Sequence, residues 1–157
     1  MKILDLKVMR GPNIWSNFRQ RVIVMTLDLR ELEHRPTHRI DGFADRIRAL
    51  LPSLYSHRCS VGNKGGFFQR VEQGTWLGHV AEHAALALQQ VVGHDIRRGK
   101  TRQVKGERGR YNIIYGYVDE QVGLAAGRLA REHTPPGISI DARGPTLDDL
   151  RRTFPGF

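Results

Sequence analysis

The amino-acid sequence predicts an α+β fold, with helices packed on a mostly antiparallel sheet of about four strands. Three observations lead to this prediction. Two strand-like runs open the chain, helical periodicity dominates its middle, and a hairpin pattern precedes a last helical segment. Hairpins join antiparallel strands, and the helices are segregated from them along the chain. The predicted order is ββαααββα.

The first two predicted strands come before any helical pattern. Residues 2–9 alternate between apolar and polar side chains, which is typical of a strand. A Gly-Pro-Asn break at residues 11–13 ends this run, and the β-branched residues of 21–30 form the second strand. The early acidic residue Asp5 and the alternation favour a strand over a signal peptide.

The next two predicted elements are helices. Apolar residues at helical spacing predict a helix over 43–51, with Asp41 as its N-cap. A short helix over 67–73 follows a glycine-rich loop at 62–66. Such a loop can hold an anion on its amides, but this one lacks the spacing of a Walker phosphate loop, which favours an ordinary turn. We therefore predict no ATP site in this chain.

A hairpin and a last helix complete the predicted domain. Residues 97–118 read as two arms joined by a glycine-containing turn at 105–109, and a helix is expected over 119–132. The Pro-Pro-Gly that follows ends the compact part. We predict one domain over residues 1–135 and a C-terminal tail or linker over 136–157.

Composition limits the class of protein but leaves several partners open. The 157 residues are enough for one domain with a core, and no apolar run reaches the length of a membrane span. The single cysteine, Cys59, excludes an internal disulfide and favours the cytoplasm. The net charge of +9 fits nucleic acid, an acidic or zwitterionic polymer, or simply a solvated surface. Tyr111, Tyr115 and Tyr117 on one strand can stack on bases, although such a row more often belongs to a sheet core.

The longest predicted helix covers residues 76–92, with Thr75 as its N-cap and Gly93 after its end. At 100° per residue, its apolar residues collect on one side. They are Leu77, Val80, Ala81, Ala84, Leu88, Val91 and Val92. The opposite side carries His79, Glu82, His83 and Gln90.

The polar side of this helix has the residue types of a hydrolytic metal site. Histidines at i and i+4, here His79 and His83, can bind one metal ion and leave a position for water. Glu82 is placed to take a proton from that water, as in the H-x-x-E-H form of the zincin motif. The alternative is a solvated face with two ordinary histidines. Leu86 on the same side indicates that the face is covered.

The pattern leaves the third ligand of such a site open. Remote acids and one histidine qualify, namely Glu72, Asp119, Glu120, Glu132 and His57. Cys59 can also be a nucleophile with a histidine partner, but a small buried residue is the favoured interpretation.

Several blocks of the sequence, in one order, resemble the N-terminal domain of cyanophycin synthetases. These blocks are MRGPNIWS at 9–16, VIVMTLDL at 22–29, LLPSL at 50–54, HRCS at 57–60, GGFF at 65–68, GTWLGHVAEH at 74–83, GKTR at 99–102, YN at 111–112 and VDE at 118–120. The resemblance covers about residues 1–133. It implies a cytoplasmic domain of an enzyme that builds cyanophycin, an aspartate backbone with arginine on each side-chain carboxyl.

The resemblance also implies a function for this domain. The ATP-dependent ligase modules that perform the ligations are not in this chain, and they become its expected partners, as does the polymer. The domain is expected to bind cyanophycin and to cut it into primers in a metallopeptidase-like manner, with His79 and His83 on zinc and Glu82 as general base. Family members typically read H-x-x-E-H-x-x-x-E-L-Q, whereas this chain has Ala87 at the second acid. A non-catalytic anchoring module is therefore the alternative, with a nucleic-acid binder behind it, and a homo-oligomer is compatible with each.

Overall fold

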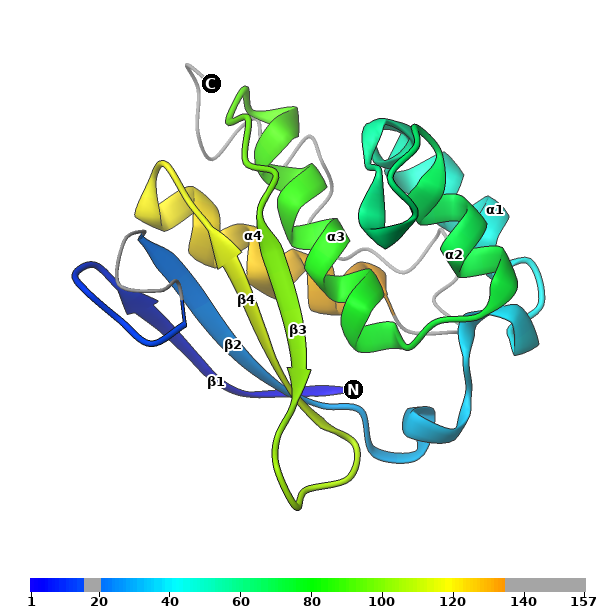
Figure 1. Cartoon of the computed structure of the whole chain (residues 1–157), viewed down its shortest axis with the longest axis horizontal. Helices are drawn as coiled ribbons and strands as arrows, with labels where there is room; N and C mark the ends of the chain where they lie inside the picture. Colours follow the sequence, from blue (N-terminus) through cyan, green and yellow to red (C-terminus); the bar gives the residue numbers. More distant parts are fainter. Residues whose placement is uncertain (16–20, 135–157) are drawn as a thin grey trace.

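The computed structural model describes residues 1–15 and 21–134, and the predicted tail at 136–157 lies outside this range. Its single sheet is antiparallel with the order β1-β2-β4-β3 (Figure 1). The strands are β1 (Lys2–Met9), β2 (Val22–Asp28), β3 (Gly99–Gln103) and β4 (Arg110–Gly116). The predicted α+β class with a mostly antiparallel sheet is confirmed.

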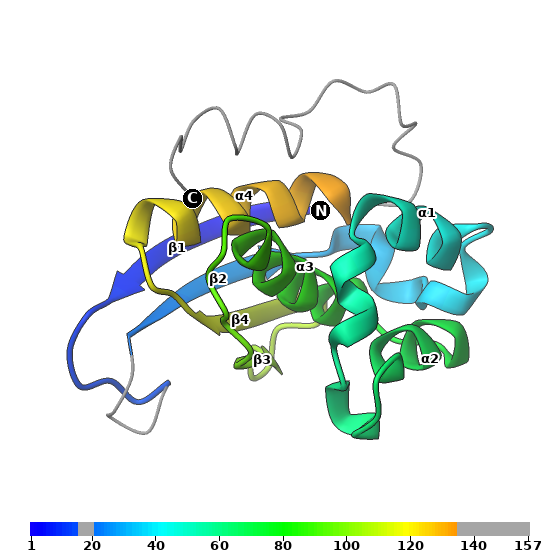
Figure 2. The same ribbon diagram turned by 90° about the horizontal axis from the view of Figure 1, so that it is seen from above.

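Four α-helices and four short 3-10 helices accompany the sheet in the described residues. They are η1 (Arg30–His34), η2 (Thr37–Arg39), α1 (Phe43–Leu50), η3 (Pro52–Ser56), η4 (Cys59–Val61), α2 (Gly66–Gln73), α3 (Leu77–Val91) and α4 (Glu120–His133). Helices α3 and α4 cover the same face of the sheet, α3 over β3 and β4 and α4 over β1 and β2 (Figure 2). Helices α1 and α2 lie together beside α3 rather than over the sheet. Among the residues described, no helix has the length and apolarity needed to cross a membrane.

The core lies between the sheet and the helical layer. Alternate residues of β2 and β4, such as Ile23, Met25 and Ile113, point toward α3 and α4 and are fully buried. The tyrosines of this region also belong to the core, because Tyr111 and Tyr117 are each only 8% exposed. The favoured interpretation of a sheet core therefore holds, and no row of exposed tyrosines is available to stack on bases.

Two predicted helix caps are wrong. Helix α1 begins after Gly42, whose φ of +62° suits a residue without Cβ, and Asp41 makes no capping bond with its side chain. The N-cap of α3 is Trp76 rather than Thr75. The Thr75 hydroxyl instead lies 2.9 Å from Nδ1 of His79, so it orients a histidine and leaves the helix end uncapped.

Candidate metal centre and pocket

The polar side of α3 is covered, not solvated. Every residue from Val80 to Gln89 is buried, and His79 and Gln90 are half-buried. The apolar side faces the sheet, whereas the side with the histidines faces the segment that runs from η3 through η4 to α2. The interpretation of a solvated helix face is therefore wrong, as Leu86 indicated.

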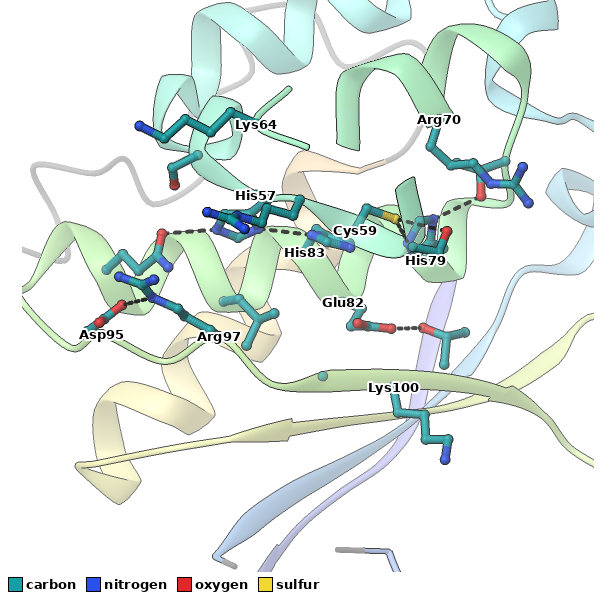
Figure 3. A pocket seen from close by; sticks show the side chains of 18 of the residues that line it. His57, Cys59, Lys64, Arg70, His79, Glu82, His83, Asp95, Arg97 and Lys100 are labelled. Atoms are coloured by element: carbon teal, nitrogen blue, oxygen red, sulfur yellow. Dashed lines mark hydrogen bonds and ion pairs between the residues drawn. The ribbon is translucent and has the colours of Figure 1, made fainter. Parts of the chain in front are cut away.

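A pocket of about 1200 Å³ opens between this segment, α3 and β3. Figure 3 shows His79 and His83 on its upper side near Cys59 and His57, and Glu82 pointing down toward β3. Its remaining charged lining is mostly cationic, with one acid, and comprises Arg58, Lys64, Arg70, Asp95, Arg97 and Lys100. The pocket thus combines nitrogen and sulfur donors, one buried carboxylate and a basic rim.

Cys59, His79 and His83 form the donor cluster of this pocket. One ligand atom from each lies within 4.8 Å of the others, and Cys59 Sγ is 3.3 Å from His79 Nε2. Cys59 is half-buried and packs against the hydrophobic core, so the favoured interpretation of a small buried residue holds in part. Its left-handed backbone, with φ of +53°, forms part of the turn that begins η4.

The acids that the sequence offered as third ligands lie elsewhere. Glu72 pairs with Arg48 and Glu120 with Arg10, while Asp119 caps α4 by accepting from the Val122 amide at 2.9 Å. Glu132 also belongs to α4 and is not part of the cluster. Ala87, where the resemblance led us to expect an acid, is fully buried in the hydrophobic core and does not line the pocket. Cys59 is the donor that completes the set.

The donor set fits a zinc ion. Thiolate and imidazole are common zinc ligands, and tetrahedral bond lengths place neighbouring donor atoms about 3.5 Å apart. The Cys59–His79 pair already has this spacing, and the most distant pair needs to approach by only about 1 Å. Three protein ligands would leave the fourth position open, which is the arrangement of catalytic rather than structural zinc sites.

Hydrogen bonds set the tautomer of His83. Gln90 donates its amide N–H to the Ile96 carbonyl at 3.3 Å, which leaves its Oε1 as an acceptor 3.0 Å from His57 Nε2. His57 therefore carries its proton on Nε2 and accepts through Nδ1 from His83 Nδ1, 2.9 Å away. The Nε2 lone pair of His83 remains available to bind a metal ion. His57 would thus orient His83 toward a metal ion, as hydrogen-bond partners of metal-bound histidines commonly do.

Burial keeps these histidines neutral, as metal ligands must be. It lowers the pKa of His79 to about 4, with a further contribution from Arg70. The pKa of His83 is lowered still more, first by burial and then by His79 and His57. Burial likewise lowers the pKa of His57.

The same burial that lowers the pKa values of the histidines raises the pKa of Glu82. Its side chain is buried, and the loss of solvent raises its pKa to about 7. Thr101 on β3 donates its hydroxyl hydrogen to Glu82 Oε2 at 2.6 Å. Gly99 makes room for the carboxylate, since a Cβ there would lie 2.7 Å from Glu82 Cγ and Oε1. A carboxylate with a pKa near neutrality can accept and return a proton at physiological pH.

The sequence of this chain matches the model of a known protein family. Residues 24–135 match the family model of the cyanophycin synthase-like N-terminal domain, so the chain belongs to this family. It is similar to the cyanophycin synthetase of Synechocystis sp., with 50% identity over 156 residues, which is 96% of this chain and 18% of the relative. The cyanophycin synthetase of Crocosphaera subtropica is 48% identical over 83% of this chain and 15% of its own length. That of Geminocystis herdmanii is 45% identical over 96% and 17%.

The resemblance found in the sequence is thereby confirmed at the level of the domain. The chain spans less than a fifth of the length of these relatives.

Proposed function

We propose that this chain binds cyanophycin and hydrolyses it into shorter chains at a metal-dependent site. The observation that carries the proposal is the position of Glu82, which has a pKa near 7 and shares a pocket with Cys59, His79 and His83. Membership of the cyanophycin synthase-like family supplies the polymer as substrate. In this proposal the partners are the polymer and ATP-dependent ligase modules, and the location is the cytoplasm, where Cys59 stays reduced.

The chemistry follows from the roles of the side chains. Cys59, His79 and His83 would hold zinc, which when bound polarises a carbonyl and acidifies water. Glu82 accepts a proton as water adds to the peptide carbonyl carbon. It returns the proton to the nitrogen as the C–N bond breaks. The hydroxyl of Thr101, which donates to Glu82 Oε2, holds the carboxylate beside β3 in the pocket.

The rim of the pocket fits the side chains of the polymer. Each arginine of cyanophycin, attached through its amino group, ends in a free carboxylate and a guanidinium. Arg58, Lys64 and Arg70 supply cations for the carboxylates. Asp95 supplies the one exposed carboxylate of the lining and is paired with Arg97 at 2.7 Å, so it can exchange this partner for a substrate guanidinium.

Chain length under defined metal conditions tests the proposal. Purified protein is incubated with cyanophycin in zinc, and separately with a chelator, and the polymer is sized by gel electrophoresis. We expect shortening in zinc only, and no shortening by Glu82→Gln. The control is Glu31→Gln, which changes an exposed acid on η1. Unchanged polymer length with zinc-loaded wild-type protein would refute hydrolysis.

A non-catalytic anchoring module is the second candidate. It is favoured by the basic lining of the pocket and by Ala87 at the place of the expected acid. An anchor predicts saturable binding of the polymer that is equal for wild type, Glu82→Gln and chelated protein, with no change in chain length. A nucleic-acid binder is supported only by the net charge, because the tyrosines expected to stack on bases are buried in the core.

A further inference from the structure

Strand β3 lies at the edge of the sheet, so only every second residue of it bonds to β4 through its backbone. The two even-numbered residues that flank the strand bond to β4, because the Arg98 carbonyl accepts from the Gly116 amide and the Val104 amide donates to the Arg110 carbonyl. In an antiparallel ladder the direction alternates from residue to residue. The amides and carbonyls of residues 99, 101 and 103 therefore point away from β4. Within residues 1–15 and 21–134, no strand pairs with that side of β3.

The same edge forms one wall of the pocket. Gly99, Lys100 and Thr101 all line it; the side chain of Thr101 reaches Glu82, whereas that of Lys100 points away from Glu82 (Figure 3). Figure 3 shows β3 running directly below Glu82 and alongside α3. An extended chain laid along residues 99–103 would therefore pass the buried carboxylate and the donor cluster.

The positive charge around the β3 edge indicates which kind of chain can pair with it. Between Asp95 and Glu107 the chain has five cationic residues and no acid. Charged residues on an edge strand disfavour pairing with a second copy of the same strand, because like charges would then lie opposite each other. They favour an extended chain that carries carboxylates.

We propose that a carboxylate-bearing peptide binds by adding a fifth strand to the open edge of β3. The backbone of the peptide pairs with residues 99, 101 and 103, which positions its peptide bonds beside Glu82. Its side chains alternate, so that half enter the pocket and half lie beside Lys100 and Arg102 on the opposite face of the sheet. This inference rests on the proposed function for the identity of the peptide, whose aspartate backbone is compatible with a strand.

Amide hydrogen exchange followed by NMR tests the pairing directly. The full chain, treated with a chelator to prevent cleavage, is saturated with a short synthetic aspartate peptide that carries arginine on each side-chain carboxyl. We expect exchange at Thr101 and Gln103 to slow by about tenfold or more, because these amides gain hydrogen bonds. Exchange at Lys100 and Arg102, which already pair with β4, should change little. A poly-lysine peptide of equal length is the control and should protect neither set.

A matched pair of variants measures the contribution of one edge amide. Gln103→Pro removes an outward N–H without removing a bond to β4, whereas Gln103→Ala keeps the N–H and removes only the side chain. We expect the proline variant to bind the peptide about threefold to tenfold more weakly and the alanine variant to bind like wild type. Circular dichroism confirms that both are folded.

The outcomes separate the two proposals. Saturable binding without protection of Thr101 and Gln103 would overturn the added strand and leave the proposed function intact. Absence of any binding by the wild-type chain would overturn both. Equal protection by poly-lysine would overturn the selection of carboxylates by the basic edge.

Discussion

Replacement of Glu82 by glutamine should stabilise the metal-free protein at high pH. Folding moves this carboxyl from an unfolded pKa of 4.5 to a folded pKa of about 7, so the folded protein holds a proton that the unfolded chain has lost. A group with a raised folded pKa contributes most stability below its unfolded pKa, and that stability is lost as the pH rises through 7. At 1.36 kcal/mol for each pH unit, the charged carboxylate costs about 3 kcal/mol well above pH 7. Glutamine is neutral at every pH and can still hydrogen-bond to Thr101.

Urea denaturation of both proteins in chelator measures this difference. Near pH 4, below the unfolded pKa of 4.5, the free energies of unfolding should nearly coincide, and at about pH 8.5 the glutamine variant should be more stable by about 1 to 3 kcal/mol. The exposed-acid variant Glu31→Gln should show no pH-dependent difference. Equal stability of Glu82→Gln and wild type across this range would refute the assignment of a buried, proton-holding carboxyl.

Three further substitutions probe the supports of the pocket. Cys59→Ser should weaken zinc binding by at least about tenfold in a competition titration with a chromophoric chelator, whereas alanine at the exposed neighbour Ser60 should not; equal affinities would exclude the thiolate as a ligand. His57→Ala leaves all three donors in place but removes the partner of His83 Nδ1, so zinc affinity should fall by about 10-fold to 100-fold in the same titration. Gly99→Ala places a methyl group against the buried carboxylate and should cost about 1–3 kcal/mol in urea denaturation. Gly11→Ala is its control, since nothing lies within 4 Å of a Cβ there, and equal losses would contradict the steric explanation.

Much of the fold was predictable because local patterns agree with tertiary packing. The alternation in residues 2–9 and the β-branched run at 21–30 became β1 and β2, and the glycine-containing turn did join β3 to β4. The longest helix was also predicted closely, since its period of apolar residues is strong and Gly93, with φ of +86°, follows its end.

Three of the pocket residues could also be predicted from the sequence of this helix. His79, Glu82 and His83 lie one turn apart or less in sequence, so helical geometry alone places them on one side.

The rest of the site depends on contacts between segments far apart in the chain. Cys59 lies 3.3 Å from His79 because η3 packs against α3 while η4 packs against α2, and no local pattern encodes that packing. Thr101 reaches Glu82 from a strand that the sequence showed only as a polar arm. Thr75 was predicted to cap α3, because a threonine hydroxyl before a helix usually bonds to a free backbone amide. The same hydroxyl can bond to a histidine instead, as it does here with His79. The one sequence signal for the complete donor cluster is Cys59 followed by the pair His79 and His83, and this signal is weak until the fold brings the three residues together.

The donor cluster joins two parts of the molecule that otherwise meet through side-chain packing and the hydrogen bonds of His57 to α3. Cys59 belongs to the small helical segment beside α3, whereas His79 and His83 belong to a helix anchored on the sheet. An ion shared by them would act as a cross-link that closes the chain between residues 59 and 79. A movement of the helical segment away from α3 would break the bond of Cys59 to the ion, and the same movement would widen the entrance for a polymer. Chelation would therefore loosen residues 52–73 while the sheet stays intact, so that metal occupancy and access to the pocket become one equilibrium.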